Sequence, residues 1–177
     1  MRVITGKYKG RHFDVPRTFK ARPTTDFAKE NLFNVLNAYI DWSDGPKALD
    51  LFAGTGSITL ELLSRGCSHV ISIEKEPLHC RFIQGFLDKL HDTDATVVRG
   101  DAFRFIGTCR DTFDIIFADP PYTLEQIPTL PDAILTRGLL APDGILVVEH
   151  GKDHDFTAHP RLVGHRAYGS VNFSLFQ

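Results

Sequence analysis

The sequence predicts an α/β domain with a mostly parallel sheet that helices cover on both faces. Short apolar runs alternate with helical patterns from residue 48 onward, which is typical of strands buried on both sides. The 177 residues, 42% hydrophobic and 24% charged, have the balance of a globular chain and not of a disordered one. This length predicts about one domain.

Five strands are expected in the parallel part of the sheet, at residues 48–52, 69–73, 95–98, 113–118 and 145–149. Helices are expected between them over residues 57–64, 77–90 and about 131–136. Pro77 marks a helix start, because the amide hydrogen that proline lacks would have no partner there. Two alternating runs, at 162–163 and 171–175, flank the Tyr168-Gly169-Ser170 turn and predict a closing antiparallel pair.

Residues 1–23 are expected to form a basic β-hairpin extension of the α/β sandwich, which spans residues 24–177. Apolar residues at 3–4 and 12–15 flank a loop that contains Gly6 and Gly10. A helix then opens near Asp26, capped by a threonine. Its buried face is expected to consist of Leu32, Val35, Leu36, Tyr39 and Ile40.

The charge is unevenly distributed. Residues 1–30 carry +5 and residues 31–177 carry −7, within a net charge of −2. A basic arm on an acidic body predicts an anionic partner, and the alternative is a solvated lysine-rich surface. The three cysteines form no CxxC pair, which favours buried thiols in a reducing cytoplasm. No apolar run is long enough to predict a membrane span or a secretory signal.

Ligands of such sheets bind beyond the carboxyl ends of the strands. The first strand ends in a loop with Gly54 and Gly56. A P-loop needs lysine where Ser57 stands, and the dinucleotide fingerprint needs glycine or alanine where Thr59 stands. A loop for S-adenosylmethionine needs only the turn and a carboxylate for the cationic methionine end, which Asp50 supplies. The alternative is a plain glycine-rich turn.

The second and third strands also end at acids. Glu74 comes 20 residues after Gly54 and can accept hydrogen bonds from ribose hydroxyls. Asp101 can accept from an adenine amino group, with Ala102 or Phe103 beside the ring. The alternatives are a solvated glutamate and a helix-capping aspartate.

The fourth strand ends in Asp119-Pro120-Pro121-Tyr122, the most informative motif in the chain. Two prolines stop the sheet ladder and hold the Asp119 carboxylate and the Pro120 carbonyl side by side as acceptors. Tyr122 offers a ring on which a base can stack. The motif therefore predicts recognition of a planar base with an exocyclic amine. The alternative is a proline turn with a surface tyrosine.

These motifs resemble class I S-adenosylmethionine-dependent methyltransferases and, more closely, the bacterial 16S ribosomal RNA guanine-N2 methyltransferase family. The resemblance rests on Gly6–Arg11, Arg22–Asp26, Leu32–Asn34, Asp50–Gly56 and Asp119–Tyr122. The family usually has Arg-Glu where this chain has Lys29-Glu30, and lysine lacks the bidentate fork of arginine.

The resemblance implies a Rossmann-like class I methyltransferase fold with a seven-stranded, mostly parallel sheet and an antiparallel last strand. It implies methyl transfer to the exocyclic N2 of a guanine in 16S rRNA, within a small ribosomal subunit or an assembly intermediate. The catalytic residues are then Asp119, Pro120 and Tyr122. The residues expected to bind S-adenosylmethionine are Asp50, Phe52, Gly54, Thr55, Gly56, Glu74, Lys75, Asp101, Ala102 and Asp119.

The basic N-terminal segment is the candidate RNA clamp. The residues expected to contact RNA are Arg2, Lys7, Lys9, Arg11, Arg22 and Tyr122. Four scattered histidines, at 150, 154, 159 and 165, have no ligand spacing, so no metal is expected. We further expect a cytoplasmic monomer with no DNA partner. Two alternative functions are glutamine-N5 methylation of a protein and a non-catalytic, cofactor-binding assembly protein.

Overall fold

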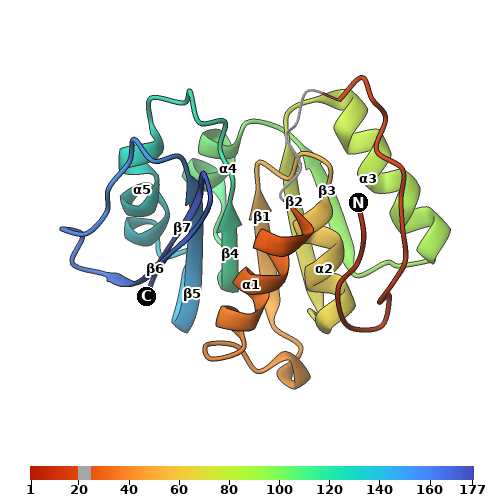
Figure 1. The fold of residues 1–177 in the computed structure, drawn as a ribbon, viewed down its shortest axis with the longest axis horizontal. Coiled ribbons are helices and arrows are strands. Elements are labelled where there is room, and N and C mark those ends of the chain that lie inside the picture. Colours follow the sequence, from red (N-terminus) through yellow and green to blue (C-terminus); the bar gives the residue numbers. More distant parts are fainter. Residues whose placement is uncertain (20–24) are drawn as a thin grey trace.

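A computed structural model describes residues 1–19 and 25–177 of the chain. Within these residues, seven strands form one sheet in the order β3-β2-β1-β4-β5-β7-β6 (Figure 1). The strands are β1 (Lys47–Leu51), β2 (His69–Glu74), β3 (Ala95–Arg99), β4 (Phe113–Ala118), β5 (Leu140–His150), β6 (Leu162–Tyr168) and β7 (Val171–Phe176). β1 to β5 pair in parallel, whereas β7 is antiparallel to β5 and β6. The predicted fold class is confirmed.

Helices cover both faces of the sheet (Figure 1). They are α1 (Asp26–Leu36), α2 (Ser57–Arg65), α3 (Pro77–Leu90), α4 (Ala102–Thr108) and α5 (Leu130–Thr136), with short 3₁₀ turns η1 (Trp42–Asp44) and η2 (Ile127–Thr129). Successive side chains of β4 separate into two cores: Phe117 packs with α1, α2 and α3, and Ile116 packs with α4 and α5. Among the described residues, no helix is both long and apolar enough to cross a membrane.

Some element boundaries differ from those expected. α1 ends at Leu36, so Tyr39 and Ile40 lie beyond it, although both pack on the same core; Phe33 is buried on its inner face, and Val35 is half-buried there. β5 begins at Leu140, before the expected start, with an irregular register against β4. No helix is expected from the sequence at α4 itself, although the alternative interpretation of Asp101 as a helix cap points to one there.

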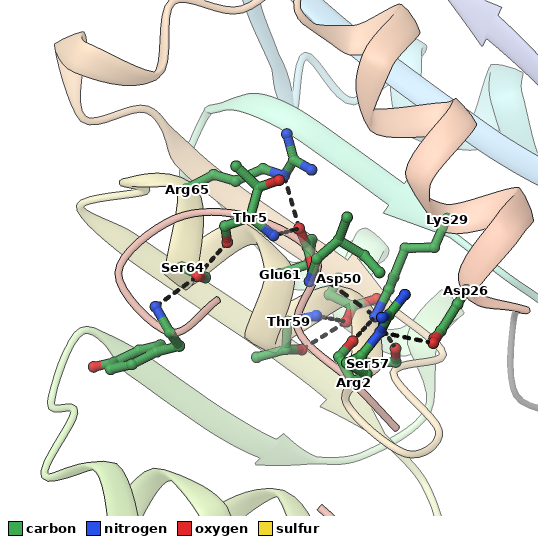
Figure 2. A network of polar contacts seen from close by, with 12 residues as sticks. Arg2, Thr5, Asp26, Lys29, Asp50, Ser57, Thr59, Glu61, Ser64 and Arg65 are labelled. Atoms are coloured by element: carbon green, nitrogen blue, oxygen red, sulfur yellow. Dashed lines mark hydrogen bonds and ion pairs between the residues drawn. The ribbon is translucent and has the colours of Figure 1, made fainter. Parts of the chain in front are cut away.

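The N-terminal segment, residues 1–13, folds back on itself through four backbone hydrogen bonds, two between Met1 and Phe13, one from Val3 to Arg11 and one from Gly10 to Val3. One isolated bridge joins Arg2 to His12, and neither arm forms a strand. The segment also bonds to α2: the amides of Ile4 and Thr5 donate to the Glu61 carboxylate, at 2.8 and 3.1 Å (Figure 2). The two arms therefore pair as a short hairpin, although too few residues pair for either arm to form a strand.

Lys29 is buried at the centre of the same network (Figure 2). Its ammonium group donates to the Arg2 carbonyl at 2.6 Å and to Ser57 Oγ at 3.0 Å, and lies 3.8 Å from Glu61. Burial lowers the pKa of Lys29, and the charge of Glu61 opposes that shift. Lys29 therefore ties α1 and the N-terminal segment to the start of α2. It is only 1% exposed and does not form a surface clamp for phosphate.

Candidate functional site

The loop between β1 and α2 turns through three left-handed residues, Phe52 (φ 62°), Gly54 (φ 55°) and Gly56 (φ 74°). A Cβ atom at Gly56 would lie 2.8 Å from Ile83 Cγ1 and 2.9 Å from the Phe86 ring. Glycine is thus required at position 56 both by the backbone angle and by close packing on α3. The sharp turn directs the start of α2 toward the carboxyl ends of the strands.

Asp50 lies under this turn and is 1% exposed. Its Oδ2 atom accepts from the Thr59 amide at 3.0 Å and from the Thr59 hydroxyl at 2.6 Å, which satisfies a donor in the first turn of α2. Burial raises the pKa of Asp50 to about 7, although the Thr59 bonds favour the ionised form. The Oδ2 atom of Asp50 is therefore occupied by hydrogen bonds within the protein. The predicted contact with the cofactor concerns the other oxygen, Oδ1.

Glu74 connects the ends of β1 and β2. Its Oε2 atom accepts from the Gly54 amide at 2.6 Å, and its Oε1 atom accepts from the Glu76 amide at 2.7 Å. The side chain is 7% exposed. These two bonds hold the Glu74 carboxylate against the glycine loop. Gly54 and Glu74, which are 20 residues apart in the sequence, are joined by one of them. Lys75, the next residue, is exposed.

The residues after β3 bring the Phe103 ring against Phe52 of the same loop. Asp101 is exposed and caps α4, because its Oδ1 atom accepts from the Arg104 amide at 3.0 Å. Ala102 is buried behind it. The rings of Phe52 and Phe103 meet edge to face, with centroids 6.2 Å apart. The capping alternative for Asp101 is confirmed, and its adenine contact stays a prediction.

The end of β4 places Asp119 among acidic groups. Its amide donates to the Leu51 carbonyl at 3.3 Å, which joins the ends of β1 and β4. Burial of the carboxyl group raises the pKa of Asp119 well above its usual value, and the charges of Glu149 and Asp50 raise it further. The following residue, Pro120, is buried.

Tyr122 is held by the end of β5. Its hydroxyl donates to Glu149 Oε1 at 2.9 Å, and its ring packs on Gly151, where a Cβ atom would lie 3.2 Å from Tyr122 Cδ2. The residue is still 36% exposed. Tyr122 is therefore a fixed platform and not a mobile surface side chain.

Sequence reasoning missed Glu149, which is 4% exposed and contacts Tyr122 while raising the pKa of Asp119. The signal was available, because Glu149 is an acid at the carboxyl end of a predicted strand, like Asp50, Glu74 and Asp119. The same rule of strand ends would have selected it.

The basic residues of the N-terminal segment fall into two groups. Lys7 Nζ lies 3.0 Å from Asp92 and 3.9 Å from Asp94, and Arg2 Nε lies 3.2 Å from Asp26. These two cations are paired within the protein. Two further cations, at positions 9 and 11, are exposed. The predicted RNA contact at Arg22 lies outside the described residues.

The histidines do not form a metal site in the described part of the chain, where no three His, Cys, Asp or Glu side chains are arranged to hold an ion. His159 contacts Asp132 at 3.2 Å, and the rings of His150, His154 and His165 lie near one another at the end of the sheet.

Comparison with known proteins gives consistent matches over the full chain. The family model described as "Conserved hypothetical protein 95" matches residues 1–177. "Putative rRNA methyltransferase YlbH" of Bacillus subtilis is 38% identical over 168 residues, 93% of this chain and 88% of the relative. "Ribosomal RNA small subunit methyltransferase D" of Escherichia coli is 30% identical over 180 residues, 100% of this chain and 89% of the relative.

Among solved structures, "Putative methyltransferase yhhF from Escherichia coli" superposes with a TM-score of 0.86 at 30% identity, covering 100% of this chain and 97% of that one. The family model and these relatives match nearly the whole chain, and the fold and the strand-end loops are those that the sequence predicted. The chain belongs to the family described as Conserved hypothetical protein 95, and its resemblance to small-subunit rRNA methyltransferases is confirmed.

Proposed function

We propose that this protein transfers a methyl group from S-adenosylmethionine to the exocyclic N2 of a guanine in 16S rRNA, acting as a cytoplasmic monomer on a small ribosomal subunit or an assembly intermediate. The observation that carries the proposal is the placement of the Asp119–Tyr122 loop next to the glycine loop after β1. The rRNA methyltransferase names of the two relatives support the substrate class.

The acceptor chemistry of the strand ends fits this cofactor. Asp50, Glu74 and Asp101 supply carboxylates for a cationic, hydroxyl-bearing and amine-bearing ligand, and Phe52 with Phe103 supplies aromatic surface. A phosphate-bearing cofactor would instead place negative charge against these acids. When bound, S-adenosylmethionine supplies a methyl group on a positively charged sulfur.

The reacting amine would be oriented by the proline loop. The Asp119 carboxylate and the Pro120 carbonyl accept its two hydrogens, which aims the nitrogen lone pair at the methyl carbon. As the N–C bond forms and the C–S bond breaks toward sulfur, the acceptors stabilise the positive charge on nitrogen. Asp119, whose pKa is raised by burial and by Glu149, then accepts the released proton. Stacking on Tyr122 contributes about 1–3 kcal/mol.

The test is methylation of small ribosomal subunits taken from a strain without this enzyme. Asp119→Ala should lower kcat, measured at saturating S-adenosylmethionine, by about 10²–10³-fold, the effect of losing one preorganised electrostatic partner. Exposed Asp111 provides the control, and Asp111→Ala should methylate at the parental rate. Mapping should place the label on one guanine N2. Label on a release-factor glutamine, or parental turnover by Asp119→Ala, would contradict the proposal.

A further inference from the structure

A pocket of about 410 Å³ lies on the α4–α5 side of the sheet, where β5, β7 and β6 meet the loop after β5. This volume is within the range of sites for small ligands. Its walls include His150, His154, Phe156, His165 and Asn172. None of these residues belongs to the site built above.

Asn172 presents a buried donor to this pocket. The residue is 7% exposed. Its Oδ1 atom accepts from His165 Nε2 at 3.2 Å, whereas its Nδ2 atom has no hydrogen-bond partner among the described residues. A buried amide that lacks an acceptor is costly, so this group is suited to a ligand that carries one.

The histidine at the back of the pocket forms a neutral aromatic wall. His150 Nδ1 donates to the Gly151 carbonyl at 2.8 Å, so its Nε2 atom accepts from the Ser174 hydroxyl at 2.9 Å. Burial lowers the pKa of His150, which favours this neutral form. Its ring stacks with that of His165, with centroids 6.0 Å apart, and meets the Phe156 ring edge to face at 5.1 Å.

The pocket adjoins the Tyr122 platform across one strand end. Glu149, which binds the Tyr122 hydroxyl, and His150, which lines the pocket, are consecutive residues of β5 and project to opposite faces of the sheet. Gly151, the next residue, packs on the Tyr122 ring and accepts from His150. The pocket and the Tyr122 platform therefore flank the same end of β5 from opposite faces of the sheet.

The charge of the pocket favours a base over a phosphate. Besides its histidines, the lining carries two charged side chains of opposite sign, Lys152 and Asp155. Aromatic rings together with an unused amide donor match an unstacked nucleobase, which has two faces and at least one acceptor on its edge. Proteins that read single-stranded RNA commonly hold splayed bases in this way.

We propose that this pocket, centred on Asn172 and His150, binds a second unpaired base of the RNA substrate, next to the nucleotide that enters the Asp119–Tyr122 site. The inference rests on the proposed function and adds that recognition requires two splayed bases. Asn172 Nδ2 donates to an acceptor on the edge of that base, and the more exposed lining rings, those of His154 and His165, contact its faces.

Asn172→Asp tests the donor, because it keeps the size of the side chain and replaces N–H groups by an acceptor. The KM for unmethylated small subunits should rise about tenfold, the effect of one mismatched buried hydrogen bond, with kcat and the dissociation constant for S-adenosylmethionine unchanged. Asn37→Asp is the matched control. Asn37 is exposed beyond the end of α1, and its Oδ1 atom accepts from the Trp42 indole. An aspartate can accept the same hydrogen bond, so the KM of Asn37→Asp should stay parental.

Ala167→Phe gives a second variant that leaves Asn172 intact and fills the pocket from β6. It should raise KM in the same way, so the proposal can be tested even if Asn172→Asp fails to fold. Unchanged binding of S-adenosylmethionine identifies a folded variant. A parental KM in the folded variants would overturn the second-base site.

Small subunits reconstituted with an abasic nucleotide on either side of the methylated position identify the occupant. One of the two should raise the KM of the parental enzyme about tenfold and have no further effect on Asn172→Asp. The proposal would be overturned if the abasic nucleotide and Asn172→Asp raised KM independently, so that their effects multiplied. It would also be overturned if neither abasic substrate changed the KM of the parental enzyme. If the parental enzyme methylates no small subunit, the proposed function fails, and this inference fails with it before any variant is compared.

Discussion

The carboxyl groups of Asp50, Asp119 and Glu149 lie on one face of the sheet, at the carboxyl ends of β1, β4 and β5. Strand alternation places them there: Ala48, Phe117 and Val147, two residues before each of them, all belong to the core under α1, α2 and α3. Burial raises the pKa of Asp119, and the charges of Glu149 and Asp50 raise it further. Such a cluster is costly for a folded protein and favourable for a cationic ligand.

Asp50→Asn should stabilise the protein at pH 8 and weaken cofactor binding. The pKa of Asp50 is about 7 in the fold against 3.8 ordinarily, so the cost of ionising it is absent below pH 4 and grows as the pH rises toward 7. A shift of this size corresponds to roughly 4 kcal/mol. Asparagine still accepts from Thr59. Tm should exceed the parental value at both pH 5 and pH 8, by clearly more at pH 8, and an equal change at both would refute this origin.

Glu149→Gln should move the pH dependence of kcat. The ionised Asp119 carboxylate is the proposed acceptor, and Glu149 raises its pKa, so kcat should increase as the pH rises through that pKa. Glutamine still accepts from the Tyr122 hydroxyl but carries no charge, so the increase should occur at lower pH. Glu125, which is exposed, provides the control Glu125→Gln. Coincident pH profiles for all three proteins would rule out the coupling.

At the scale of elements, α2 serves both the cofactor loop and the N-terminal segment. Its first turn is bonded to Asp50 through Thr59, and its last turns bond to the segment through Glu61 and Ser64. Ser64 Oγ accepts from the Tyr8 amide at 2.9 Å. A displacement of the segment would therefore be transmitted along one short helix to the site.

Glu61→Ala should destabilise the protein by about 3 kcal/mol, because it leaves buried Lys29 and Arg65 without their carboxylate. It also removes the acceptor of two backbone amides. Urea unfolding measures the first effect, and faster trypsin cleavage within residues 1–13 measures the second. Asp88→Ala, which removes an exposed contact on α3, should change neither. Parental cleavage in Glu61→Ala would show that other contacts hold the segment.

At the scale of the whole molecule, the exposed cations of the N-terminal segment oppose an acidic body. Lys9→Glu with Arg11→Glu should weaken binding of small subunits and reduce the slope of log affinity against log salt by about 1–2. Lys7 is unsuited to this test, because it is paired with Asp92. Lys47→Glu with Arg110→Glu, exposed near the amino ends of β1 and β4, should keep the parental slope. Equal slopes in all three proteins would contradict an RNA-binding segment.

The sequence by itself determined the order of the strands and helices and most of the strand-end residues. This was possible because period-2 and period-3.6 patterns are local, and because one rule places ligands at the carboxyl ends of parallel strands. Gly54, Glu74 and Asp119 could be selected in this way without any knowledge of their neighbours.

Only the tertiary structure decided which side chains pair. Lys7 with Asp92, Lys29 with Glu61 and Tyr122 with Glu149 are partners from separate elements, and no local repeat relates their positions. The same holds for the pocket at Asn172, whose unused amide is defined by what packs around it. Hydrogen bonding and burial depend on distances that exist only after the sheet has closed, so composition and spacing could indicate the chemistry but not its partners.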